Sequence, residues 1–214
     1  MRIDKRREAI IRRYSAGERT NHWVVAMTFV LLAVSGLALF HPSMFWMSAL
    51  LGGGTWTRIL HPFLGVLMFV AFLIMAVRFW HHNVLDARDR DWLRHGREVL
   101  TTHEEAVPEV GRYNAGQKLL FFLMVFSLVL LLLSGIVIWR TYFSPFFPIW
   151  ALRVASVVHA VCAFVLICGI IVHIYAAVWV KGSVQAMTRG TVTPGWAWKH
   201  HRAWFRETFG PGDK

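Results

Sequence analysis

The sequence predicts an all-α integral membrane protein, a four-transmembrane-helix bundle with its N and C termini cytoplasmic, and three observations predict it. The 214 residues are 56% hydrophobic and only 16% charged, whereas soluble proteins average roughly 45–50% apolar and 25% charged residues. The mean hydropathy is +0.47. The apolar residues gather in four long runs, and the few charges are mostly basic, with a net charge of +11.

Each apolar run is long enough to cross about 30 Å of hydrocarbon as a helix that rises about 1.5 Å per residue. We predict spans at residues 22–40, 60–80, 119–139 and 154–180. The polar residues 1–19 precede the first run, so we expect a retained span rather than a cleavable signal peptide. Residues 1–214 are interpreted as a single membrane domain.

The basic residues set the predicted orientation. Residues 1–21 hold seven Lys and Arg, the middle loop 81–118 holds six, and the tail 181–214 holds six. The two remaining loops carry only Arg58, and Arg140 with Arg153. By the positive-inside rule, the N-terminal segment, the middle loop and the tail are cytoplasmic, and the short loops face the periplasm of a bacterial inner membrane.

The distribution of charge and cysteine excludes several classes of protein. A nucleic-acid reader carries its basic residues on a polar surface, which does not match basic loops between apolar runs. There is no C-x-x-C-H motif for a c-type haem. Cys162 and Cys168 are six residues apart, so on one helix they point about 120° apart and are not expected to form a disulfide.

Four of the eleven histidines lie in or at the head of a predicted span, where a polar side chain is costly and usually functional. The predicted topology places His22 and His173 near the cytoplasmic side and His61 and His159 near the outer side. His159 and His173 are fourteen residues apart. On a helix this spacing advances about 21 Å and ends about 40° short of four full turns, so both rings share one face.

Each ring of the last span can therefore meet one histidine at its own depth, His61 opposite His159 and His22 opposite His173. Two such pairs match two transmembrane b haems, and an iron with two imidazole ligands keeps no open position, which suits electron transfer. Zinc fits less well because it needs about four converging ligands. Gly36, fourteen residues after His22, predicts a bare patch at the depth of the outer haem.

Other interpretations stay open at this point. Any of these histidines could bond across helices or sit at a wet interface, and small residues such as Gly36 also serve helix packing. His81 and His82, at the end of the second span, compete with His22 for the inner site. His200 and His201, in the basic tail, are expected to face solvent or a partner, and the aromatic tail itself to lie on the membrane surface or dock a partner.

Five stretches distributed along nearly the whole chain resemble a known family, the gamma subunit of membrane-bound respiratory formate dehydrogenase, which is a dihaem cytochrome b. These stretches are ERTNHW at 18–23, RILHPF at 58–63, WHHN at 80–83, GRYNAGQK at 111–118 and HIYAAVWVKG at 173–182.

The resemblance implies a membrane anchor with two haem b groups, held by His22, His61, His159 and His173. A periplasmic catalytic alpha subunit with molybdenum or tungsten and a pterin would oxidise formate. An iron–sulfur beta subunit would pass electrons to the outer haem, and the inner haem would reduce menaquinone or ubiquinone at the cytoplasmic side. The resemblance also implies that Asn114, Gly116 and Gln117 line the quinone pocket.

No residue of this chain resembles a formate-oxidising centre, so we expect that chemistry in a partner subunit and only quinone reduction here. Two alternatives stay open. The chain could be the cytochrome b subunit of another respiratory enzyme, such as nickel hydrogenase or thiosulfate reductase. It could also be a haem-free membrane anchor whose histidines merely pack helices.

Overall fold

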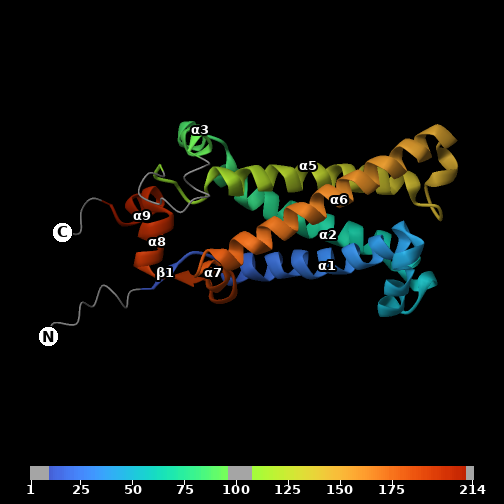
Figure 1. Cartoon of the computed structure of the whole chain (residues 1–214), viewed down its shortest axis with the longest axis horizontal. Coiled ribbons are helices and arrows are strands. Elements are labelled where there is room, and N and C mark those ends of the chain that lie inside the picture. Colours follow the sequence, from blue (N-terminus) through green and yellow to red (C-terminus); the bar gives the residue numbers. More distant parts are fainter. Residues whose placement is uncertain (1–9, 96–107, 211–214) are drawn as a thin grey trace. The chain divides into compact units, whose positions relative to one another are not determined.

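The computed structural model describes residues 10–95 and 108–210. In these ranges the regular secondary structure is helical except for one antiparallel pair of two-residue strands, and turns and irregular segments connect these elements (Figure 1). The chain divides into two compact units. Residues 20–77 and 123–174 form the span unit, which contains most of the four long helices. Residues 10–19, 78–95, 108–122 and 175–210 are the described part of the other, the terminal unit.

Four long helices dominate the chain, and each is long and apolar enough to cross a membrane. They are α1 (Ala16–Phe40), α2 (Gly54–Asn83), α5 (Ala115–Ile138) and α6 (Ile149–Trp179). This confirms the four predicted spans. All four helices begin four to six residues before the predicted starts.

The extension of α1 has a local cause in its first turn. The Ser15 backbone N–H donates to Glu18 Oε2 at 2.6 Å, and the Glu18 N–H donates to Ser15 Oγ at 3.2 Å. This reciprocal capping box satisfies backbone donors that the first turn of a helix leaves free. The helix can therefore begin at Ala16, six residues before the apolar run.

The span unit buries several small polar side chains and leaves many of its large apolar side chains exposed. Its buried polar residues are Thr28, Ser35, Ser48, Thr57, Ser127 and Ser134. Only 17–22% of the most apolar window of each long helix is buried within the chain. Large apolar side chains that remain exposed need an apolar surrounding, which a bilayer supplies and water does not.

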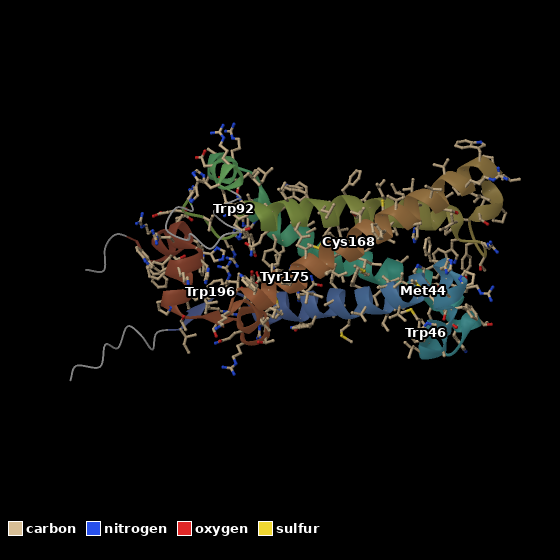
Figure 2. All side chains as sticks on the ribbon, viewed as in Figure 1. Met44, Trp46, Trp92, Cys168, Tyr175 and Trp196 are labelled. Atoms are coloured by element: carbon tan, nitrogen blue, oxygen red, sulfur yellow. The ribbon has the colours of Figure 1, made fainter. Side chains whose placement is uncertain are left out.

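Two 3₁₀ segments connect the long helices of the span unit, η2 (Pro42–Leu51) between α1 and α2 and η4 (Ser144–Phe146) between α5 and α6. Trp46 on η2 is 68% exposed and is labelled in Figure 2. Cys162 and Cys168 on α6 are both free thiols. The prediction that they form no disulfide is confirmed.

The terminal unit joins the two ends of the chain. Strand β1 (Ile11–Arg12) pairs with β2 (Thr191–Val192). Three short helices, α7 (Ser183–Arg189), α8 (Pro194–His200) and α9 (Arg202–Phe209), complete the tail. A buried cluster of Ile11, Ala186, Val192, Ala197 and Trp204 forms its core. The tail is therefore folded against the N-terminal segment rather than an isolated surface segment.

A buried arginine lies beside this core. Arg13 is only 4% exposed, and its guanidinium carbon lies 4.6 Å from the ring centroid of Trp204 and 5.0 Å from that of Trp196, on α8 (Figure 2). Its Nη2 donates to the Arg112 carbonyl at 2.6 Å and lies 3.3 Å from His201 Nε2. These contacts tie the N-terminal segment to the tail and to the segment before α5.

The expectation that His201 faces solvent or a partner is wrong. His201 is 3% exposed, and its Nδ1 lies 2.9 Å from the Gly111 carbonyl oxygen. Burial, followed by the nearby charge of Arg13, lowers the pKa of His201 to about 3. A protonated ring would sit without solvent beside a guanidinium, so the folded chain keeps this histidine neutral.

Helix α3 (Ala87–Arg94) is held in the terminal unit by a buried ion pair. Lys118 Nζ lies 2.7 Å from Asp89 Oδ2, and the two side chains are only 7% and 6% exposed. Lys118 Nζ also donates to the Val84 carbonyl at 3.1 Å and lies 3.7 Å from Asp86 Oδ2. The middle loop thus contains a short helix of its own, while residues 96–107 lie outside the described residues.

Candidate functional site

Two pairs of histidine rings face each other within the span unit. His61 from α2 and His159 from α6 have ring centroids 6.2 Å apart, with their planes at 65°. His22 from α1 and His173 from α6 have ring centroids 6.3 Å apart, with their planes at 47°. The structure thus brings together the same partners that sequence spacing and topology paired.

The separation of the rings suits a single metal ion between them. A bond from a metal to an imidazole nitrogen is about 2.0–2.1 Å, and the nitrogen lies roughly 1.1 Å from its ring centre, so opposed imidazoles on one ion have centroids about 6.2–6.4 Å apart. Both observed distances lie in this range. Directly packed aromatic rings lie about 4.5–7 Å apart, so the spacing is compatible with an ion between the rings and does not by itself require one.

The donor set favours haem over a bare metal ion. Among the described residues there is no group of three or more His, Cys, Asp or Glu side chains that could hold a metal. Two opposed imidazoles leave four coordination positions in the plane between them, and the four nitrogens of a porphyrin fill those positions. The residues of both pairs therefore fit haem, while their assignment as ligands stays a prediction.

A Ser-Gly dipeptide on a neighbouring helix supports each ring of the His61–His159 pair. Ser35 Oγ lies 2.7 Å from His61 Nδ1. A Cβ atom added to Gly36 would lie 3.4 Å from His61 Cε1. The missing side chain therefore makes room for the imidazole of α2, which is a closer role than the bare patch expected from the sequence.

The same arrangement recurs between α5 and α6. Ser134 Oγ lies 3.0 Å from His159 Nδ1, and a Cβ atom on Gly135 would lie 3.4 Å from His159 Cε1. Sequence reasoning missed both serines. A usable signal was present, because each Ser-Gly dipeptide stands 25 or 26 residues before the histidine that it contacts.

An apolar hollow of about 430 Å³ adjoins this arrangement. Ser134 forms part of its wall together with apolar residues of α5, of α6 and of the short segment between η4 and α6, among them Val137, Phe147 and Val154. Its volume falls in the range of small-molecule sites, roughly 300–1,000 Å³. The hollow is largely open, and neither His61 nor His159 lines it, so its link to the histidine pair is the shared wall residue Ser134.

The competing histidines take another arrangement. His81 and His82 belong to the terminal unit and pack on each other, with ring centroids 3.8 Å apart. This distance leaves no space for an ion bound between the two rings. The ring that faces His173 within the span unit is His22, which favours His22 as the first-span ligand.

The predicted quinone residues lie at the start of α5, in the terminal unit. The Gln117 N–H donates to Asn114 Oδ1 at 2.9 Å, and the Asn114 N–H donates to Gln117 Oε1 at 3.0 Å. Both side chains therefore cap the helix through their oxygens, and each amide keeps an –NH₂ donor. A Cβ atom on Gly116 would lie 3.3 Å from the Trp92 ring, so this glycine admits a side chain of α3.

Comparison with known proteins decides the family. The profile of the prokaryotic cytochrome b561 family matches residues 13–190. The chain belongs to this family. Cytochromes of this family are haem b proteins of electron transport, so the chain is a multi-pass membrane cytochrome b, and haem b is its cofactor.

Several curated relatives are similar to this cytochrome b over most of its length. It is 49% identical over 203 residues to the cytochrome b556(fdo) subunit of formate dehydrogenase from Escherichia coli, covering 95% of each chain. It is 44% identical to the nitrate-inducible cytochrome b556(Fdn) subunit of the same organism, covering 89% of this chain and 88% of the relative. It is 42% identical to the formate dehydrogenase cytochrome b556 subunit of Haemophilus influenzae, covering 96% and 87%.

Proposed function

We propose that this cytochrome b holds two b haems, one between His61 and His159 and one between His22 and His173. The observation that supports this is the ring separation of 6.2–6.3 Å in two independent pairs, the spacing expected for two imidazoles on one iron. Bound there, the haems would supply one-electron transfer between the two sides of the membrane.

The protein residues hold and shield these groups. Four imidazoles supply the axial nitrogens, and Ser35 and Ser134 fix the orientation of two of them. The large apolar side chains of the long helices surround the pairs and exclude water from the spans. Because both axial positions are filled by protein, the sites suit electron transfer and leave no position for oxygen.

We further propose that the chain anchors a formate dehydrogenase in the bacterial inner membrane. The curated relatives carry that name, and the motifs resemble the gamma subunit. An iron–sulfur subunit would deliver electrons, and a subunit with molybdenum or tungsten would oxidise formate outside. The charge distribution supports this orientation, since only Arg58, Arg140 and Arg153 of the 23 Lys and Arg fall in the span unit.

The electron acceptor that we propose is menaquinone or ubiquinone, bound by Asn114, Gly116 and Gln117 on the cytoplasmic side. The two –NH₂ donors left free by the capping box can donate to a quinone carbonyl oxygen. Replacing Asn114 with Asp keeps the capping oxygen and removes its donor. We expect this variant to keep both haems and lose quinone reduction, while unchanged quinone reduction would contradict the assignment.

The test of the haem assignment is spectroscopic. We expect the purified subunit, or its complex, to show two b-type haems per chain in a reduced-minus-oxidised spectrum. Substituting His159 with Ala should remove one haem, and substituting His173 with Ala should remove the other. His95, a half-buried histidine of the middle loop at the end of α3, provides the matched control and should lose none.

Two outcomes would overturn the proposal. A chain purified from its own membrane without a b-type spectrum would support the haem-free anchor. Retention of both haems in either histidine variant would show that other side chains bind the iron. The electron donor that reduces the haems identifies the enzyme complex. Formate reduces the haems of a formate dehydrogenase complex, whereas hydrogen reduces those of a nickel hydrogenase complex.

A further inference from the structure

The two histidine pairs differ in what surrounds the ring nitrogen that does not face the partner ring. In the His61–His159 pair both Nδ1 atoms lie 2.7–3.0 Å from a serine hydroxyl. In the His22–His173 pair, His22 Nδ1 is buried and has no hydrogen-bond partner among the described residues. The pairs have similar ring spacing but unlike hydrogen bonding.

The direction of the serine contacts follows from the backbone around them. Ser35 Oγ also lies 3.1 Å from the Leu32 carbonyl oxygen, and Ser134 Oγ lies 2.6 Å from the Leu130 carbonyl oxygen. A carbonyl can only accept, so each hydroxyl donates its hydrogen to the backbone. The serine oxygen is then left to accept, and the imidazole Nδ1–H donates to it. In this tautomer Nε2 carries no hydrogen and is the nitrogen that would bind an iron.

Donation from the far ring nitrogen makes a metal-bound imidazole a more basic ligand. A more basic axial ligand stabilises ferric iron more than ferrous iron, because the ferric ion carries the larger charge. Hydrogen bonding to axial ligands is accordingly one of the means by which a protein sets a haem potential. The His61–His159 pair has two such donations, and His22 lacks one.

We propose that Ser35 and Ser134 are positioning residues that lower the reduction potential of the haem at the His61–His159 pair below that of the haem at the His22–His173 pair. The inference rests on the proposed two-haem function. This difference in reduction potential would give electron transfer between the two haems a preferred direction. An electron on a haem held by His61 and His159 would move to a higher potential on passing to a haem held by His22 and His173, so this transfer would be favourable.

The test uses variants that keep the shape of the site. Ser35→Cys and Ser134→Cys are nearly isosteric and replace a good acceptor with a weak one. Ser127→Ala provides the control, since Ser127 is also buried on α5, two turns before Ser134. Redox titration of the purified subunit, followed in the haem bands, gives the two potentials, and the His159→Ala variant identifies the one that belongs to the His22–His173 haem.

At a fixed applied potential, we expect the ferric-to-ferrous ratio of the His61–His159 haem to fall about tenfold in each cysteine variant. For a one-electron couple this corresponds to an upward shift of about 59 mV in the reduction potential of that haem. The other haem and the Ser127→Ala protein should keep their potentials. If a cysteine variant loses the haem, the Ser→Thr variant at that position keeps a hydroxyl acceptor and should retain the haem at its original potential.

Three results would overturn the proposal. They are unchanged potentials in both cysteine variants, an equal shift in Ser127→Ala, and a threonine variant that shifts as far as its cysteine counterpart. A wild-type protein in which the His61–His159 haem already has the higher potential would also overturn it. Fewer than two haems in the wild-type protein would instead contradict the proposed function, so the two failures are distinguishable.

Discussion

Removing one partner of the Lys118–Asp89 ion pair should destabilise the terminal unit strongly. Both side chains are over 90% buried and lie 2.7 Å apart, and breaking a buried pair typically costs about 3–5 kcal/mol because the remaining charge is uncompensated. In Asp89→Asn, Lys118 still has the half-exposed Asp86 at 3.7 Å. We therefore expect a loss near the lower limit, about 3 kcal/mol.

Unfolding of the detergent-solubilised protein in mixed micelles measures this loss. The exposed pair of Arg94 and Asp91, at 3.7 Å, provides the matched control, and Asp91→Asn should change stability by less than about 1 kcal/mol. Adding Lys118→Met to Asp89→Asn removes the stranded charge, so the double variant should be more stable than Asp89→Asn alone. Equal losses in Asp89→Asn and Asp91→Asn, or single losses that simply add, would refute this reasoning.

Three further predictions concern the haem pocket and the tail. Gly36→Val places methyl groups against the His61 ring, and such overpacking costs about 1–3 kcal/mol. The affinity for one haem should therefore fall by roughly 5- to 150-fold, which the haem content after dilution measures. The pKa of His201 is lowered to about 3 in the folded chain, so between pH 6.5 and 3 the unfolded chain binds a proton that the folded chain does not. Lowering the pH to 5 should therefore reduce the free energy of unfolding by up to about 2 kcal/mol. In thermal melts, His201→Gln should flatten this pH dependence. Gly190 has φ +81°, and an added Cβ would lie 2.7 Å from a backbone oxygen. Gly190→Ala should therefore lower the stability by at least about 1–2 kcal/mol and expose the tail to protease. Gly195→Ala, whose Cβ meets open space, is the control and should do neither.

The four spans and the pairing of the histidines could be predicted because both depend on local periodicity. Apolar length alone locates a membrane helix. The fourteen residues between His159 and His173 fix their common face through the geometry of one helix. The charge counts then placed each ring on one side of the membrane and so matched it with one partner. Spacing and topology alone did not separate His22 from His81 and His82, and the family resemblance favoured His22.

The serines and the folding of the tail were beyond the same reasoning. Ser35 contacts a ring 26 residues away on another helix. Only the recurrence of the Ser-Gly dipeptide at nearly the same distance before His159 distinguishes it from the many small residues that serve helix packing. His201 looked like an exposed residue of a basic tail, yet its burial depends on Arg13, 188 residues earlier. Contacts between distant segments leave no periodic trace in the sequence.

Helix α6 contributes one ring to each histidine pair and runs without interruption for 31 residues. The distance between the two sites is therefore set by helical rise and not by a loop or a subunit boundary. Inserting one residue between His159 and His173 would turn one ring by about 100° and displace it by about 1.5 Å. Only one pair could then keep its register, so the length of this segment is as strict a requirement as the histidines themselves.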